Sequence, residues 1–103
     1  MKAYQHPTPE QFDLTCVLHA LSDPVRLDFV RQLAECKDEV SCGTLPTTVA
    51  KSTMSHHLRV LRESGIIKIR SEGTQSLITL RYKELESRFP GVIKSVLKAA
   101  GIF

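Results

Sequence analysis

The chain has 103 residues, of which 42% are hydrophobic and 24% are charged, and its net charge is +3. These values suit one folded domain of ordinary size and argue against a disordered chain. No apolar run reaches the ~18 residues of a membrane-spanning helix and the N-terminus lacks a signal-peptide core, so we expect a cytoplasmic protein with no membrane partner.

The charge is unevenly distributed along the chain. Residues 1–50 carry four basic and seven acidic side chains, whereas residues 51–83 carry seven basic and two acidic ones. A basic block inside a nearly neutral protein indicates a polyanionic partner such as nucleic acid. The alternative is an ordinary solvated basic face.

Two helices are predicted in the first third of the chain. Residues 1–9 should form a flexible N-terminal arm, and a first helix should run from about Pro9 to Ala20. A second helix should follow the motif SDPVR and continue to about Glu35, because Asp23 can cap it and Pro24 suits the first helical position. Its apolar residues recur at four-residue steps, as one face of a helix requires.

The middle of the chain contains the most strongly periodic segment. The stretch CKDEVSCG should be a polar connection, followed by a short helix at residues 42–45 and a tight turn. A long helix is then predicted from about Ala50 to Ser64. Its inward face holds Met54, Leu58 and Leu61. Gly65 suits the left-handed position that ends helices.

After Gly65 the apolar period changes from about 3.6 to 2. In IIKIR, isoleucines alternate with Lys68 and Arg70. SEGT supplies a turn at Gly73, and QSLITL returns as a second strand. YKELESRF predicts a short helix, and PGVIKSVLKAA a final one that Pro90 begins. The predicted fold is therefore mostly α with a two-stranded β-hairpin after a helix-turn-helix.

The outer face of the predicted helix at 50–64 is polar near its beginning and basic toward its end. On a helical wheel it gathers Ser52, Ser55, His56, Arg59 and Arg62. Small polar groups and arginine at such positions suit the major groove of double-stranded DNA. Lys68 and Arg70, on the exposed side of the hairpin, could hold the phosphate backbone beside the groove.

Two segments, ALSDPVRLDFVRQL and STMSHHLRVLRESGIIKIRSEGT, closely resemble the ArsR-type (arsenic-repressor-like) winged helix-turn-helix transcriptional regulators. The resemblance runs from about residue 10 to the C-terminus, so residues 10–103 should form the DNA-binding domain. It implies a homodimer through the first and last helices, a recognition helix at 50–64, a wing at 66–80, and repression that an unidentified signal relieves. It also places one set of side chains against DNA: Lys51, Ser52, Thr53, Ser55, His56 and Arg59.

The sequence departs from this family at three places. Ala50 stands where many relatives carry a serine that caps the recognition helix, and Thr48 is a candidate substitute. EVSCGTL keeps a single cysteine, at a shifted position, where relatives carry the sensor box ELCVCDL. The histidine- and aspartate-containing zinc motif of the last helix is absent, because no histidine follows His57. We therefore predict no metal and no cofactor.

The histidines do not indicate metal chemistry. His56 and His57 are adjacent on a helix and cannot readily share one ion, whereas a zinc pair needs i, i+4 spacing. His56 should face DNA. His57 should either contact DNA at the rim of the interface or pack beneath the helix. We expect His6 on the surface and His19 in helix packing.

The cysteines leave a second hypothesis open. Their odd number does not suit a disulfide framework, and we expect Cys16 to be buried as a small apolar residue. Cys36 and Cys42, with Cys16, could act as a thiol-redox or arsenite sensor. Unpaired thiols without a sensing role are the simpler interpretation. A winged-helix protein-interaction module without DNA binding is a further alternative. An enzyme is not expected, because no phosphate loop or nucleophile motif occurs.

Overall fold

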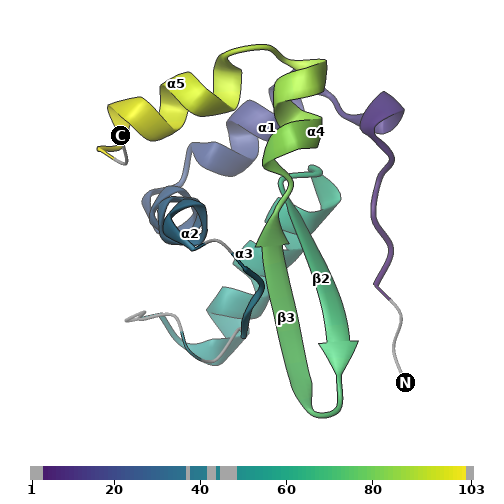
Figure 1. Ribbon diagram of the computed structural model, residues 1–103. Coiled ribbons are helices and arrows are strands. Elements are labelled where there is room, and N and C mark those ends of the chain that lie inside the picture. The colour runs from purple at the N-terminus through teal and green to yellow at the C-terminus, as the bar shows by residue number, and fades with distance from the viewer. Residues whose placement is uncertain (1–3, 37, 42–43, 45–48, 102–103) are drawn as a thin grey trace.

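Helices surround one end of a small antiparallel sheet, and a hairpin of this sheet extends away from them (Figure 1). The computed structural model describes residues 4–36, 38–41, 44 and 49–101. The predicted short helix at 42–45 lies outside these residues, apart from Thr44. In chain order the elements are η1 (Pro9–Gln11), α1 (Leu14–Leu21), α2 (Pro24–Glu35), β1 (Val40–Ser41), α3 (Lys51–Glu63), β2 (Ile67–Glu72), β3 (Gln75–Leu80), α4 (Tyr82–Arg88) and α5 (Val92–Ala99).

The first helix is shorter than predicted. Instead of one helix from Pro9, the chain forms the single 3-10 turn η1, and α1 begins only at Leu14. The reason is Asp13, whose side chain accepts a hydrogen bond of 3.0 Å from the backbone amide of Thr15 and so caps α1. Between the two helical segments, Phe12 has an extended backbone and its side chain enters the core.

Helix α2 has the caps and bounds that the sequence predicts. The carboxylate of Asp23 accepts hydrogen bonds from the amides of Val25 and Arg26 at 2.9 and 3.1 Å. Pro24 occupies the first turn, where its missing amide costs nothing. Both signals are local, and the prediction of a helix ending at about Glu35 is confirmed.

Helix α3 is held by its predicted apolar face. Met54 and Leu61 are buried and Leu58 is half-buried against the core. Ala50 is the N-cap residue and supplies no capping side chain, as the sequence indicates. At the other end Gly65 has φ of 92°, and a Cβ there would overlap the ring of Phe12. Glycine is therefore required both by the backbone angle and by the packing.

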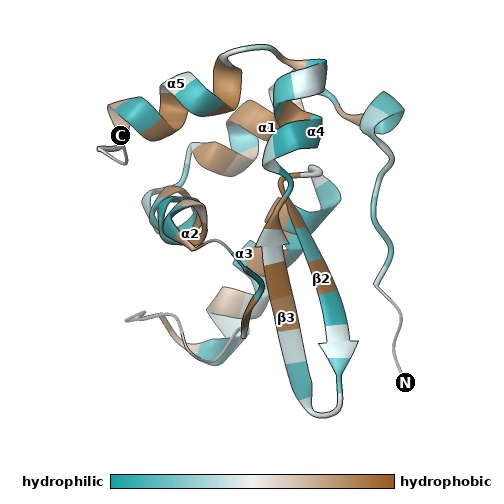
Figure 2. Ribbon diagram, viewed as in Figure 1, coloured by the Kyte–Doolittle hydropathy of each residue, from teal (hydrophilic) through white to brown (hydrophobic). Residues whose placement is uncertain are grey.

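The hairpin β2–β3 is confirmed, with Ile69 opposite Ile78 and a turn at Gly73, whose φ is 62°. Hydrophobic and hydrophilic residues alternate along β2 (Figure 2), so one face of the strand packs on the helices. The sheet also has a third strand that the sequence did not predict. β1 pairs antiparallel with β3 through Val40 and Ile78, which gives the strand order β1-β3-β2.

The C-terminal helices close the core. α5 begins at Val92 rather than at Pro90, because Gly91 precedes it with φ of 83°. Leu85 of α4 and Ile93 and Leu97 of α5 are fully buried. They join one continuous core with residues of α1, α2, α3 and the sheet. In the part of the chain that the structure describes, none of the helices has the length and apolar character needed to span a bilayer.

Candidate nucleic-acid interface

The outer face of α3 is exposed along its whole length. The predicted contact residues on this face are all exposed: Lys51, Ser52, Thr53, Ser55, His56 and Arg59. Lys51 and Arg59 form no ion pair with any other described residue, so their charges face solvent unneutralised. The opposite face of the helix is buried, which fixes the direction in which these side chains point.

A buried polar contact orients α3 against α2. Arg26 is 7% exposed, and its Nε donates to the carbonyl oxygen of Ala20 at 2.6 Å. Its Nη1 lies 3.2 Å from Nδ1 of His57, which is 8% exposed. Nε2 of His57 points toward the carboxylate of Asp23, at 3.9 Å. Of the two positions that the sequence left open for His57, the structure shows packing beneath the helix.

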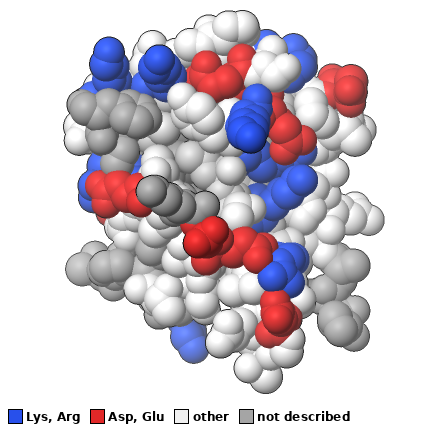
Figure 3. All heavy atoms as spheres, in the orientation of Figure 1, with Lys and Arg blue, Asp and Glu red and all other residues white. Residues whose placement is uncertain are grey.

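The wing carries its two predicted basic residues on the exposed side of β2, but they differ in their surroundings. Arg70 donates to both carboxylate oxygens of Glu39 at 2.6 and 2.7 Å and forms an ion pair of 2.8 Å with Glu72. These hydrogen bonds raise the pKa of Arg70 above its ordinary value. Lys68 has a looser contact, 3.9 Å from Glu84. Acidic and basic atoms therefore lie side by side on this face (Figure 3).

Arg62 differs from the rest of the predicted DNA-contacting set because it contacts the N-terminal segment of the chain. Its Nη1 donates to the carbonyl oxygen of Gln5, and its guanidinium lies 5.7 Å from the centre of the Tyr4 ring. These partners belong to residues 4–8, which we call the N-terminal strap. Sequence reasoning predicted a flexible arm here and did not anticipate these contacts, because nothing in the local pattern pairs Gln5 with a residue 57 positions away.

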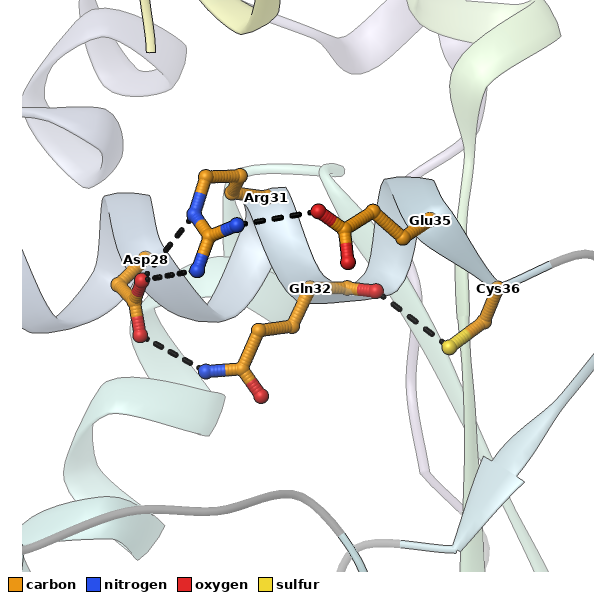
Figure 4. A network of polar contacts seen from close by, with 5 residues as sticks. All are labelled: Asp28, Arg31, Gln32, Glu35 and Cys36. Atoms are coloured by element: carbon orange, nitrogen blue, oxygen red, sulfur yellow. Dashed lines mark hydrogen bonds and ion pairs between the residues drawn. The ribbon is translucent and has the colours of Figure 1, made fainter. Parts of the chain in front are cut away.

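The structure describes two of the three predicted sensor thiols, Cys16 and Cys36. Cys36 ends α2, is exposed, and donates a hydrogen bond to the carbonyl oxygen of Gln32 at 3.4 Å (Figure 4). It lines a cavity of about 640 Å³ bounded by α2, β3, α4 and α5. Cys16 is exposed on α1, so the prediction that it is buried is wrong for this chain. Cys42 lies outside the described residues.

The described histidines, cysteines and carboxylates do not gather into a metal site. The described residues contain no group of three or more histidine, cysteine, aspartate or glutamate side chains arranged to hold an ion. His19 is exposed on α1, not packed as predicted. His6 is half-buried rather than on the surface, and its ring contacts the wing. Neither histidine lies in a ligand cluster.

An apolar stripe remains exposed on α1. Among the described residues, Leu14 and Leu18 are the large hydrophobic side chains classed as exposed, at 39% and 45%. They are four residues apart and so lie on the same side of the helix. We call this exposed pair the apolar stripe of α1.

Comparisons with known proteins agree with this arrangement. Residues 21–70 match the model of a helix-turn-helix domain family. The chain is 30% identical over 82 residues to an uncharacterized HTH-type transcriptional regulator, YceK of Bacillus subtilis. The aligned region covers 78% of this chain and 82% of that protein.

Two solved structures have a similar fold. The crystal structure of the transcriptional repressor BigR from Xylella fastidiosa is 35% identical with a TM-score of 0.60, over 74% of this chain and 85% of that one. An ArsR family transcriptional regulator has a TM-score of 0.66 at 19% identity, over 94% and 98% of the two chains. These relatives are transcriptional regulators and not enzymes. The chain belongs to the ArsR-type winged helix-turn-helix transcriptional regulators.

Proposed function

We propose that this chain is a sequence-specific DNA-binding repressor that acts in the cytoplasm as a homodimer on an imperfect palindrome. The observation that carries the proposal is the exposed face of α3, where polar residues precede the unpaired cation Arg59 while the opposite face is locked into the core. Such a face can enter the major groove, with the small side chains near base edges and arginine on guanine or phosphate.

The proposed dimer follows from the apolar stripe of α1. Leu14 and Leu18 would pack across a two-fold axis together with α5, the last helix. A two-fold arrangement would place two copies of α3 about 34 Å apart, which is one turn of DNA, so that they enter successive major grooves. The two half-sites of the operator would then mirror the symmetry of the protein.

The test begins with selection of bound duplexes from a random DNA pool. The double variant Arg59→Ala with Lys68→Ala should weaken binding to the selected duplex at least tenfold at physiological salt while leaving the oligomeric state unchanged. The matched control is Arg31→Ala with Lys83→Ala, which removes the same charge from a half-buried and an exposed position outside the α3 face and the outer side of β2. Equal losses in both double variants would contradict the proposal.

Salt dependence gives a second criterion. Each phosphate contact releases counterions, so the logarithm of the binding constant should fall linearly with the logarithm of the salt concentration. The Arg59→Ala and Lys68→Ala double variant should show a shallower slope in this plot, and the difference should correspond to the loss of about two phosphate contacts. Affinity that does not change between low and physiological ionic strength would exclude this mode of binding.

A thiol-based signal is the second candidate, and Cys36 supports it through its exposure and its place at the cavity. In this version, oxidation or arsenite binding at Cys36 and Cys42, with Cys16 as a further ligand, would shift the connection before α3 and release DNA. Gel-shift titrations with peroxide and arsenite should then release the wild type but not Cys36→Ser. Identical release of both proteins would remove Cys36 from the mechanism.

A protein-interaction module without DNA binding is the less favoured alternative, because Lys51 and Arg59 leave the α3 face basic. Such a module would lose its partner on substitution of apolar surface residues and not on loss of Arg59. The same DNA selection distinguishes the two functions, since a module of this kind would enrich no sequence from the pool.

A further inference from the structure

The N-terminal strap covers the open edge of the wing. β2 is an edge strand of the sheet, and its outward backbone groups therefore lack a strand partner. At its centre, the amide of Ile69 donates a hydrogen bond of 3.0 Å to Nε2 of His6. Figure 1 shows the N-terminal segment running beside β2 on the side away from β3. A side chain of the strap thus takes the place that a further strand would occupy.

Three other contacts tie the strap to separate elements. The hydroxyl of Tyr4 lies 3.3 Å from that of Ser76 on β3. The carbonyl oxygen of Gln5 accepts from Arg62 at the end of α3. The carbonyl oxygen of Pro7 accepts a 2.8 Å hydrogen bond from Arg81, which is buried between β3 and α4. The strap therefore links the recognition helix α3 to the wing.

The contact at Ile69 requires a neutral imidazole, because Nε2 accepts the amide hydrogen and must carry no proton of its own. The charged groups that face His6 are cations from three elements: Arg62 of α3, Lys68 of β2, and Arg81 after β3. Glu84 of α4 offsets part of this charge through its ion pairs with Arg81 and Lys68. Burial first, and then these cations, hold the pKa of His6 below its ordinary 6.5.

We infer that His6 is a positioning residue for DNA recognition: in its neutral form it holds the strap between the wing and Arg62 of α3 and so fixes the wing relative to α3, and its protonation releases the strap. This inference rests on the proposed function. A protonated ring would present an N–H to the Ile69 amide and a positive charge to the three cations. Release would leave the wing less preorganised, and the affinity for DNA should then fall.

The direction with pH follows from the sign of the shift. The docked strap holds His6 with a lowered pKa, so the docked state binds fewer protons than the released state. The strap is therefore fully docked above about pH 6.5, the ordinary pKa of histidine. Docking weakens as the pH falls from that value through the lowered pKa of His6. Mildly acidic solution should open the strap while the fold persists.

The experiment compares the wild type with His6→Gln, His6→Ala and His19→Gln. The amide oxygen of glutamine can accept from Ile69 without titrating, and alanine removes the acceptor. His19 is an exposed histidine on α1 and serves as the matched control. Hydrogen exchange of the Ile69 amide, read by NMR as a protection factor at pH 7.5 and 5.5, reports the strap directly.

In the wild type and in His19→Gln, protection of Ile69 should fall roughly tenfold between pH 7.5 and 5.5, the loss of about one hydrogen bond. Protection of Ile69 should stay high in His6→Gln and low in His6→Ala at both pH values. Affinity for the selected duplex should be equal in wild type and His6→Gln at pH 7.5, and about threefold weaker in the wild type at pH 5.5. Comparing the two proteins at the same pH removes every effect of pH on DNA binding that they share.

Protection of Ile69 that does not change with pH in the wild type, or that falls equally in His6→Gln, would overturn the role of His6. If protection of Ile69 changes with pH as expected but the wild type and His6→Gln bind DNA equally well at pH 5.5, the positioning role is overturned. Failure of every variant to bind DNA at any pH would instead contradict the proposed function, and the exchange data would still decide whether His6 holds the strap.

Discussion

Nη1 of Arg26 lies 3.2 Å from Nδ1 of His57, and this contact joins α2 to α3. The guanidinium is the donor, so Nδ1 accepts and the proton of the neutral ring sits on Nε2. That nitrogen faces Asp23, the residue that caps α2. One arginine therefore connects the start of α2, the end of α1 and the underside of α3.

Replacement of this arginine should destabilise the protein strongly. Arg26→Ala would leave the Ala20 carbonyl and the His57 ring buried without their donor, and the expected loss is about 3 kcal/mol of unfolding free energy. Urea denaturation measures it. Arg31→Ala breaks ion pairs with Asp28 and Glu35 on the exposed side of α2 (Figure 4) and should destabilise the protein far less, because solvent screens exposed ion pairs. Similar losses for both would refute this account of α3.

The start of α3 can be improved. Ala50 already has the extended backbone of an N-cap residue, with φ of −61° and ψ of 153°, but no side-chain oxygen. Ala50→Ser should stabilise the protein by about 1 kcal/mol, seen as a rise in Tm. Ala50→Gly, which lacks the hydroxyl, serves as the control. A serine variant no more stable than the glycine variant would show that another group already caps this helix.

The apolar stripe of α1 should control oligomerisation. Leu14→Glu with Leu18→Glu places two charges where the proposed interface needs apolar contact, and sedimentation velocity should then show a monomer. Because both side chains are partly exposed in the single chain, the fold should survive, which circular dichroism can verify. Thr74→Glu, at the exposed turn of the wing, should leave the dimer intact. A dimer that persists in the double variant would place the interface elsewhere.

The acidic partners of Arg70 should restrain its contact with DNA. Glu39→Gln removes a carboxylate that holds both nitrogens of a bidentate pair, so Arg70 becomes available for phosphate. Affinity measured by fluorescence anisotropy should rise a few-fold at low salt, and the salt slope should steepen by about one contact. Glu35→Gln removes the same charge beside Arg31 and should have no such effect. A wing that does not touch DNA would give the same result for both variants.

Where the signals are local, the sequence predicts this structure well. Asp23 and Pro24 define the start of α2, Gly65 the end of α3, and the alternation of isoleucine with Lys68 and Arg70 the first strand of the wing. The exposed α3 residues were found in the same way, because a helical wheel separates them from Met54 and Leu61. Each of these features depends on residues within one or two turns.

The features that were missed depend on partners distant in sequence. β1 is two residues in a polar connection, and it is a strand only because β3 lies beside it. From the sequence, Arg62 and Arg70 are both predicted to be exposed cations. In the structure, Arg62 donates to the carbonyl oxygen of Gln5 and Arg70 to the carboxylate of Glu39. His6 likewise gains its role from Ile69, a residue 63 positions away. The DNA contacts assigned to these arginines remain predictions.

The contact between Gly65 and the ring of Phe12 limits how this protein can be re-engineered. The hairpin β2–β3 follows α3 through a residue that has no room for a side chain, since the Phe12 ring fills that space. A hairpin transplanted from another regulator to alter operator preference would therefore have to be spliced in after this glycine. A graft that replaced this glycine would displace the Phe12 ring from the core and destabilise the protein, so the new specificity would be lost as well.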